Sequence, residues 1–369
     1  MVNKLDTGVK IVRNVLRYNI GEGAIEELPK IIDKKKTQGE SQTAVYIIDE
    51  FFKDRIDILS SLDINDLDEV LFISTIDEPT TKYINELNKF LMTKLEAMPV
   101  AIVGMGGGIA MDIAKAISNL LTNGGKAEDY QGWDLVNNPG IFKVAIPTLS
   151  GTGAEATRTC VMTNKSSGLK LGMNSDFTVY DQIIMDPNLT KSVPESQYFY
   201  TGMDAYIHCI ESLNGSFRNA IGDSYSAQTI NLCREVFQSE DMMSDTNRSK
   251  LMVASYLGGC AIATSYVGVV HPFSAGLSVV LGIHHCLANC IVMRAMHEFY
   301  PTEFKEFWEM VEKQKIHIPS GVCENLSNKE LDELYSSTIV HEKPLLNALG
   351  DNFKKILTKE KVIELFQEM

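Results

Sequence analysis

The stretch VAIVGMGGGIAMDIAKAISNL, residues 100–120, joins an apolar run, a group of glycines and a helical pattern in immediate succession. Val100 to Val103 predict a buried strand, and Ile109 and Ile113 begin a helical repeat. Glycines at such a junction let the backbone approach a phosphate, with free N–H groups and the positive end of the helix dipole facing it. We therefore predict a strand–turn–helix unit in which Gly106 to Gly108 could bind a nucleotide.

The same glycines also have a purely structural explanation. The dinucleotide fingerprint GxGxxG, read from Gly104, fails at Ile109, and the GK[ST] of a P-loop is missing. A glycine-rich turn is as often a packing device as a phosphate site. Asp49 favours the nucleotide, because a carboxylate that ends an early strand can hydrogen-bond ribose hydroxyls and repel a 2'-phosphate. A helix N-cap or a loop residue is the alternative role for Asp49.

Apolar runs alternate with amphipathic stretches through the first half of the chain, which predicts a parallel sheet. Strands are expected at Ala44–Ile48, Val70–Thr75, Val100–Val103, Lys143–Ile146 and Gln182–Met185, and helices at 23–33, 80–95 and after Gly108. From Pro194 onward only helical periodicity remains. We therefore expect an α/β dinucleotide-binding domain at residues 1–190 and an all-α metal-binding domain at residues 191–369.

The composition narrows the class of protein. The 369 residues, 44% hydrophobic and 22% charged, can bury a large core, and a net charge of −14 without a basic cluster argues against nucleic acid as a partner. Glycines and histidines interrupt the uncharged run from Leu251 to Met293, which predicts buried helices and no membrane span. The seven cysteines lack paired spacing, so we expect them to be reduced and buried. The charged N-terminus lacks the apolar core of a secretory signal, so we expect the protein in the cytoplasm.

Four candidate metal ligands stand in or near this uncharged run. Asp204 and His208 are one helical turn apart and share a helix face, and His271 and His285 follow. Three imidazoles and a carboxylate can hold a divalent ion, iron or zinc, and leave a position for a substrate oxygen. Such a site favours loss of the proton of an alcohol and hydride transfer to a nicotinamide. The alternative is a set of satisfied core histidines and a helix cap at Asp204.

His284 is the ambiguous neighbour of His285. Adjacent residues on a helix point about 100° apart, so only one of these two imidazoles can face the ion. By the same geometry, we expect Cys209 and Cys286 to be turned away from it.

Several motifs, taken in order, resemble those of the iron-dependent, group III alcohol dehydrogenase family over nearly the whole chain. Gly106-Gly107-Gly108 with Asp112 and Lys115 is similar to the family turn GGGSxxDxxK. Residues 147–157, PTLSGTGAEAT, resemble PTTAGTGSEVT, and residues 202–211, GMDAYIHCIE, resemble GLDALTHAIE. His271 and His285 match the two later metal histidines in spacing.

The resemblance implies a dinucleotide-binding α/β domain, an all-helical domain, NAD and one divalent metal ion as cofactors, and a homodimer. The metal ligands would be Asp204, His208, His271 and His285. The cofactor contacts would come from Asp49, Gly106, Gly107, Gly108, Asp112, Thr148, Thr152 and Lys170.

The chain departs from the family pattern at several positions. Ala275 stands where many members have a further histidine, and His284 is the candidate substitute for a catalytic imidazole. Ile109 replaces a serine, Leu149 a threonine and Glu78 an asparagine. These changes indicate an unusual substrate.

The chain as a whole looks most like the branch of the family that oxidises C8 of the acidic sugar 3-deoxy-manno-octulosonate (Kdo) for lipopolysaccharide. Arg158 and Lys191 are candidate cations for the sugar carboxylate. We therefore expect NAD- and metal-dependent oxidation of a primary alcohol. Two alternatives are a dehydroquinate-synthase-like lyase that recycles NAD within one turnover and a non-haem iron oxygenase with a facial triad of ligands.

Overall fold

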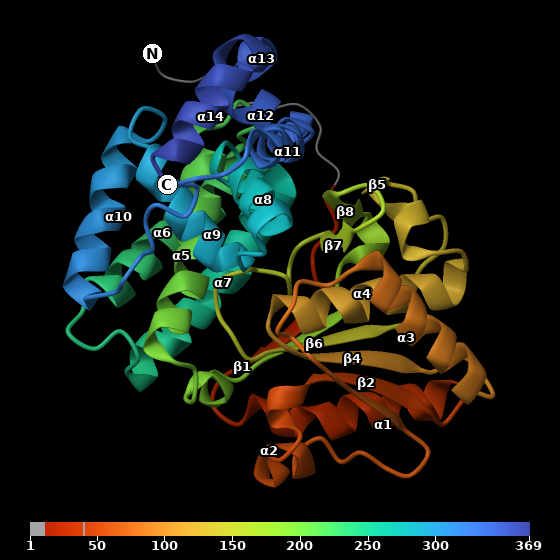
Figure 1. The fold of residues 1–369 in the computed structure, drawn as a ribbon. Helices are drawn as coiled ribbons and strands as arrows, with labels where there is room; N and C mark the ends of the chain where they lie inside the picture. The colour runs from red at the N-terminus through yellow and green to blue at the C-terminus, as the bar shows by residue number, and fades with distance from the viewer. Residues whose placement is uncertain (1–11, 40) are drawn as a thin grey trace. The chain divides into compact units, whose positions relative to one another are not determined.

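The computed structural model describes residues 12–39 and 41–369, which divide into two compact units (Figure 1). The α/β unit comprises Val12–Leu149 and Ala154–Ser192, and the helical unit comprises Ser150–Gly153 and Val193–Met369. The short segment Ser150–Gly153 therefore belongs to the helical unit, although the residues on both sides of it belong to the other.

The α/β unit is built on a six-stranded parallel sheet with the order β1-β9-β6-β4-β2-β3. The strands are β1 (Arg17–Ile20), β2 (Ala44–Asp49), β3 (Glu69–Ile73), β4 (Ala101–Gly106), β6 (Lys143–Pro147) and β9 (Gln182–Met185). The predicted parallel sheet is confirmed, and every strand except β1 was expected from its apolar run.

Helices cover both faces of this sheet, which explains why its central strands are buried throughout. Leu28 and Ile32 of α1 (Leu28–Gln38) pack against Tyr46 and Ile48 of β2. Figure 1 shows α3 (Thr81–Lys94) and α4 (Gly108–Asn123) on the opposite face. The short α2 (Ile56–Ser60) follows β2. The chain runs outward from β2 to β3 and then returns to β4, so the strand order reverses between β2 and β4.

A small second sheet contains β5 (Gly132–Trp133), β7 (Thr159–Asn164) and β8 (Leu169–Asn174). Strands β7 and β8 pair in antiparallel register, with Thr163 opposite Lys170. This pair is the hairpin that was predicted around Lys170.

The described residues of the helical unit contain no strand. Its helices are α5 (Glu195–Asn214), α6 (Ala220–Phe237), α7 (Asp245–Ser265), α8 (Val270–Leu281), α9 (His285–Val292), α10 (Pro301–Gln314), α11 (Asn328–Ile339), α12 (Glu342–Leu349), α13 (Phe353–Ile356) and α14 (Lys359–Gln367). Helix α5 lies in the middle of this unit and packs against α6, α7 and α9.

Within the described chain, no single helix has the length and apolar composition of a membrane span. Helices α7 and α8 have that length and composition only when they are taken together, and the chain bends by 105° at the break between them. All seven cysteines are buried and free, as predicted.

Candidate active site

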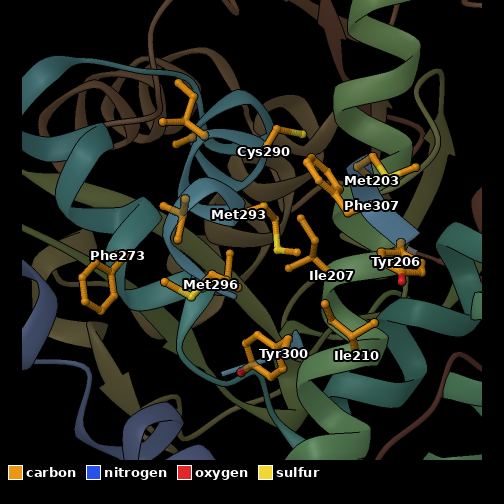
Figure 2. Packing of buried hydrophobic residues seen from close by; sticks show 14 of the residues in the cluster. Met203, Tyr206, Ile207, Ile210, Phe273, Cys290, Met293, Met296, Tyr300 and Phe307 are labelled. Atoms are coloured by element: carbon orange, nitrogen blue, oxygen red, sulfur yellow. The ribbon is translucent and has the colours of Figure 1, made fainter. Parts of the chain in front are cut away.

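Helix α5 presents two predicted metal ligands on a face that differs from its core face. Met203 and Ile207 point into the hydrophobic cluster of the helical unit (Figure 2). Residues four and seven positions apart share a helix face, which places Asp204, His208 and Glu211 together. All three are buried, and Asp204 and Glu211 have no exposed surface. A carboxylate in such a position needs partners, because burying an unpaired charge is costly.

His271 and His285 come from the first turns of α8 and α9. Helix α8 ends at Leu281, and the left-handed conformation of its C-cap Gly282 (φ 68°) allows the chain to turn at once toward α9. His284 is the N-cap of α9 and His285 its first residue. Side-chain exposure rises from 4% at His208 to 12% at His271 and 30% at His285, so the cluster is most accessible at His285.

The three imidazoles surround the carboxylate of Asp204. Its Oδ1 lies 3.4 Å from Nε2 of His208 and 3.3 Å from Nε2 of His271. Its Oδ2 lies 3.7 Å from Nε2 of His285. The rings of His208 and His271 stack with their centroids 4.7 Å apart. The structure thus brings together the four residues that the sequence pattern proposed as ligands.

Burial and charge act differently on these groups. Burial lowers the pKa of His208 to about 4, which leaves a neutral imidazole with a lone pair to offer. Burial also opposes the charge of His271, but the Glu211 carboxylate and the hydrogen bonds to Asp204 and Glu211 raise its pKa to about 9. The pKa of Asp204 is lowered despite its burial, because His208, His285 and His271 face it. Metal binding would require His271 to lose its proton.

The donor set fits a divalent ion. One ligand atom from each of Asp204, His208 and His271 lies within 4.8 Å of the others, and His285 adds a third imidazole. Three imidazoles around one buried carboxylate are the chemistry of a transition-metal site.

Three neighbours of the cluster were not predicted. Glu211 pairs with Nδ1 of His271, and the Asn289 amide lies 2.7 Å from Oδ1 of Asp204. The Cys286 thiol lies 3.7 Å from Oδ2 of Asp204, so the prediction that Cys286 is turned away was wrong. His285 and Cys286 both lie in the first turn of α9, and this end of the helix faces Asp204. The side chains of both residues therefore reach the carboxylate of Asp204, although they differ in length. Cys209 belongs to the hydrophobic core, as expected.

His284 has a different environment from His285. It is exposed and precedes the first turn of α9, and no described contact of Asp204 involves it. Ala275 is buried within α8. The catalytic role of His284 stays a prediction.

The predicted nucleotide site lies where the strand order of the sheet reverses. Parallel α/β sheets bind ligands at the carboxyl ends of their strands at such a reversal. Asp49 ends β2 and Gly106 ends the neighbouring β4. A Cβ at Gly106 (φ 151°) would lie 2.6 Å from Cβ of Ala110 and 3.0 Å from Cβ of Asp49. Gly107 caps α4 without a side-chain bond. The bare backbone forms a cradle that side chains would fill, which fits a pyrophosphate.

Asp112 and Lys170 are held by protein partners. Asp112 accepts a hydrogen bond of 2.9 Å from the Val161 amide and lies 3.8 Å from Nζ of Lys115. Burial raises the pKa of Asp112 to about 6, although Lys115 opposes this shift. Lys170 pairs with Glu78 at 3.2 Å. These contacts give both side chains a structural role in the α/β unit, and their contact with a cofactor stays a prediction.

Thr148 and Thr152 fall in different units. The Thr148 amide donates to the carbonyl of Gly106 at 3.0 Å, which ties the second loop to the end of β4. Thr152 lies in the segment that belongs to the helical unit, where the Gly153 amide donates to Oγ of Ser255 at 3.3 Å. Thr148 is therefore joined directly to the glycine turn.

Comparison with known proteins agrees with this architecture. The chain matches the model of the iron-containing alcohol dehydrogenases over residues 16–187 and that of the C-terminal part of Fe-containing alcohol dehydrogenases over residues 198–337. The crystal structure of a 1,3-propanediol oxidoreductase superposes with a TM-score of 0.84 at 19% identity, covering 98% of this chain and 100% of that one. A sulfoacetaldehyde reductase from Bifidobacterium kashiwanohense, in complex with NAD+, gives 0.79 at 20% identity, covering 97% and 98%. These structures show the fold.

Sequence relatives point the same way. Sulfoacetaldehyde reductase of Bilophila wadsworthia is 35% identical over 51% of this chain and 49% of its own length. Alcohol dehydrogenase 4 of Schizosaccharomyces pombe is 31% identical over 54% and 48%, so the chain spans about half the length of these two relatives. NAD-dependent methanol dehydrogenase of Bacillus methanolicus is 28% identical over 74% and 71%. The chain belongs to the iron-containing alcohol dehydrogenase family.

Proposed function

We propose that this chain is an NAD- and divalent-metal-dependent oxidoreductase that interconverts a primary alcohol and its aldehyde. The observation that carries the proposal is the buried cluster in which His208, His271 and His285 surround Asp204. The glycine cradle beside Asp49 and the names of the relatives, alcohol dehydrogenases among them, support it.

Each residue has a definite part in this proposal. When bound, a divalent ion supplies a Lewis acid that makes an alcohol a stronger acid, and NAD supplies the hydride acceptor. Asp204, His208, His271 and His285 would hold the ion, for which we propose iron, with zinc as the alternative that the same donors accept. The turn at Gly106 to Gly108 would hold the pyrophosphate, and Asp49 the ribose.

For the specific substrate we propose C8 of Kdo, on the sequence resemblance. One expected contact changes: Arg158 is paired with Asp134 and with Asp176, so it is not a free cation for the sugar carboxylate. The assay should therefore compare Kdo with uncharged primary alcohols. Sulfoacetaldehyde, offered with reduced cofactor, is the second acidic substrate to compare, because a relative reduces it.

The test is the absorbance of reduced nicotinamide with metal-stripped protein reloaded with iron or zinc. We expect NADH to form only after reloading, and Asp204→Asn and His271→Ala to lose both bound metal and turnover. His297→Ala, at a histidine whose side chain is 50% exposed, is the matched control and should match wild type. Full turnover and metal content in Asp204→Asn would reject the proposal. Product without net NADH would indicate the lyase, and oxygen-dependent turnover without NAD the oxygenase.

We also propose a homodimer in the cytoplasm. Strand β1 is an edge of the sheet and exposes Tyr18 (54%) and Ile20 (45%), and Leu16, the residue before it, is 74% exposed. An exposed apolar edge strand is a template for pairing with another chain. Light scattering should give twice the mass of the chain, and Ile20→Lys should shift it toward the monomer. The seven free cysteines support a reducing compartment.

A further inference from the structure

Glu211 is the third polar residue on the ligand face of α5, and it contacts His271 in two ways. Its Oε2 pairs with Nδ1 of the His271 ring. Its Oε1 accepts hydrogen bonds from the backbone amides of Val270 at 2.5 Å and His271 at 3.4 Å. One wholly buried carboxylate therefore holds both the ring and the backbone of a proposed ligand.

The ring contact selects the tautomer of His271. A neutral imidazole carries one N–H, and the carboxylate of Glu211 accepts it at Nδ1. Once His271 has lost its second proton, as metal binding requires, the lone pair is on Nε2, which lies 3.3 Å from Oδ1 of Asp204. Nε2 is the atom that faces the other proposed ligands. The contact also fixes the rotation of the ring, because a flip would turn Nδ1 away from Glu211.

The backbone contacts anchor the helix that carries this ligand. The residue before α8, Val269, gives no side-chain cap, and the carboxylate of Glu211 takes its place at the positive end of the helix. The chain must pass very close to Glu211 for this. A Cβ on Gly268 would lie 3.3 Å from Cβ of Glu211 and 2.6 Å from the hydroxyl of Tyr300. Gly268 thus leaves the space in which Glu211 reaches two successive amides.

We propose that Glu211 is a positioning residue that sets the metal affinity of the site, through the tautomer and orientation of His271. This inference rests on the proposed metal-dependent function. It assigns no contact with substrate or cofactor to Glu211. Removing an outer carboxylate of this kind lowers metal affinity by about 10–100-fold in comparable sites.

The experiment compares Glu211→Gln with wild type in metal-stripped protein. Competition with a chromogenic chelator gives the dissociation constant for Co²⁺, and thermal unfolding reports the fold. We expect the dissociation constant to rise by about 10–100-fold. The metal-free variant should stay folded, because the amide oxygen can still accept from Val270, but it should melt below wild type, because the charged contact with His271 is lost. The matched control is Glu306→Gln, which loses a carboxylate that pairs with Arg234 and Tyr206 in the same unit. It should change stability but not metal affinity.

A second measurement needs no variant. Nitrogen-15 NMR of histidine-labelled, zinc-loaded protein should show His271 protonated at Nδ1 and bound through Nε2. Binding through Nδ1, or unchanged Co²⁺ affinity in Glu211→Gln, would overturn the proposal. If wild type binds Co²⁺ but shows no NAD-linked turnover, the proposed function fails while the affinity comparison still decides the role of Glu211. A wild-type protein that binds no Co²⁺ at this site overturns both.

Discussion

The side-chain amide of Asn289 donates a hydrogen bond of 2.7 Å to Oδ1 of Asp204, and both residues are wholly buried. The same nitrogen lies 3.3 Å from Nε2 of His285 and 3.5 Å from Nε2 of His271. Asn289 is one turn after His285 on α9, so ligand and amide share a face. The Asn289 amide therefore donates a hydrogen bond to the proposed ligand Asp204 without adding a charge to the cluster.

The first prediction exchanges this donor for a carboxylate. In Asn289→Asp, two buried carboxylates would face each other, and they cannot both ionise at low cost. We expect the metal-free variant to melt below wild type and to gain more stability than wild type on addition of Co²⁺, which would offset the repulsion. Thermal unfolding with and without Co²⁺ measures both effects.

The control for this prediction is Asn289→Ala. It removes the donor without adding charge, and losing a hydrogen bond to a charged group costs about 1.5–3 kcal/mol. Its response to Co²⁺ should not exceed that of wild type. If Asn289→Asp gained no more from Co²⁺ than wild type does, the amide would not be near the ion.

The second prediction concerns the loop segment that belongs to the helical unit. Gly151 has φ 151°, and a Cβ there would overlap the carbonyl oxygen of Thr201, three residues before Asp204. Gly151→Ala combines a clash with backbone and an unfavourable conformation, and should cost about 3 kcal/mol or more. The free energy of unfolding in urea measures it. Gly168→Ala, at a glycine with φ 68° and open space around it, should lower the free energy of unfolding by only about 1 kcal/mol. Equal losses in the two variants would show that the backbone conformation, and not the clash with Thr201, determines the cost at Gly151.

The sheet was predictable because its central strands are buried on both faces. The residues of β2 from Ala44 to Ile48 are all buried, so they form a continuous apolar run in the sequence. Such a run predicts a strand without knowledge of the strands that pair with it. Strand β1 is a half-exposed edge with the sequence RYNI, and its pairing depends on β9, more than 160 residues away. No local pattern marks such a strand.

The proposed site also contains features that follow from the local sequence and features that depend on how distant segments pack. Asp204 and His208 are four residues apart on one helix, so their proximity follows from helix geometry. The contacts of Glu211, Cys286 and Asn289 depend on where α8 and α9 dock against α5. The i+7 spacing from Asp204 to Glu211 was a signal that could have been used. The spacing from His285 to Asn289 was another, because it repeats the one-turn interval of the first two ligands.

The third prediction tests the choice between NAD and NADP. The carboxylate of Asp49 accepts hydrogen bonds from the Phe51 amide at 3.0 Å and from Oγ1 of Thr75 at 3.1 Å, which fix it at the end of β2. Asp49→Asn removes the charge that would repel a 2'-phosphate. A hydrogen bond to a charged group contributes about 1.5–3 kcal/mol, so kcat/KM with NAD should fall about 10-fold or more while that with NADP rises.

Kinetics with both cofactors give the ratio directly. Asp57→Asn, at an exposed acid on α2, is the control and should leave the ratio unchanged. A ratio that is the same in Asp49→Asn and wild type would remove Asp49 from the cofactor site.

The fourth prediction follows from a buried lysine at the start of β6. Lys143 on β6 is 1% exposed, and its Nζ lies 3.8 Å from Oδ2 of Asp181. Burial lowers its pKa from 10.5 to about 8, although Asp181 opposes this shift. The unfolded chain therefore binds more protons than the folded chain between pH 8 and 10.5. Stability from this group rises with pH across that window, by up to about 3 kcal/mol.

Other groups titrate in the same range, so the informative quantity is the difference between wild type and Lys143→Met. Methionine has a similar length and no charge. Within this pH range, the free energy of unfolding of Lys143→Met should exceed that of wild type by most at pH 8, because burying the partly protonated lysine costs wild type most there. Urea unfolding at several pH values gives the free energy of each protein. We expect the advantage of Lys143→Met to shrink steadily as the pH approaches 10.5. A difference that stays constant from pH 8 to 10.5 would mean that Lys143 keeps its ordinary pKa, and that Asp181 compensates fully for the burial of its charge.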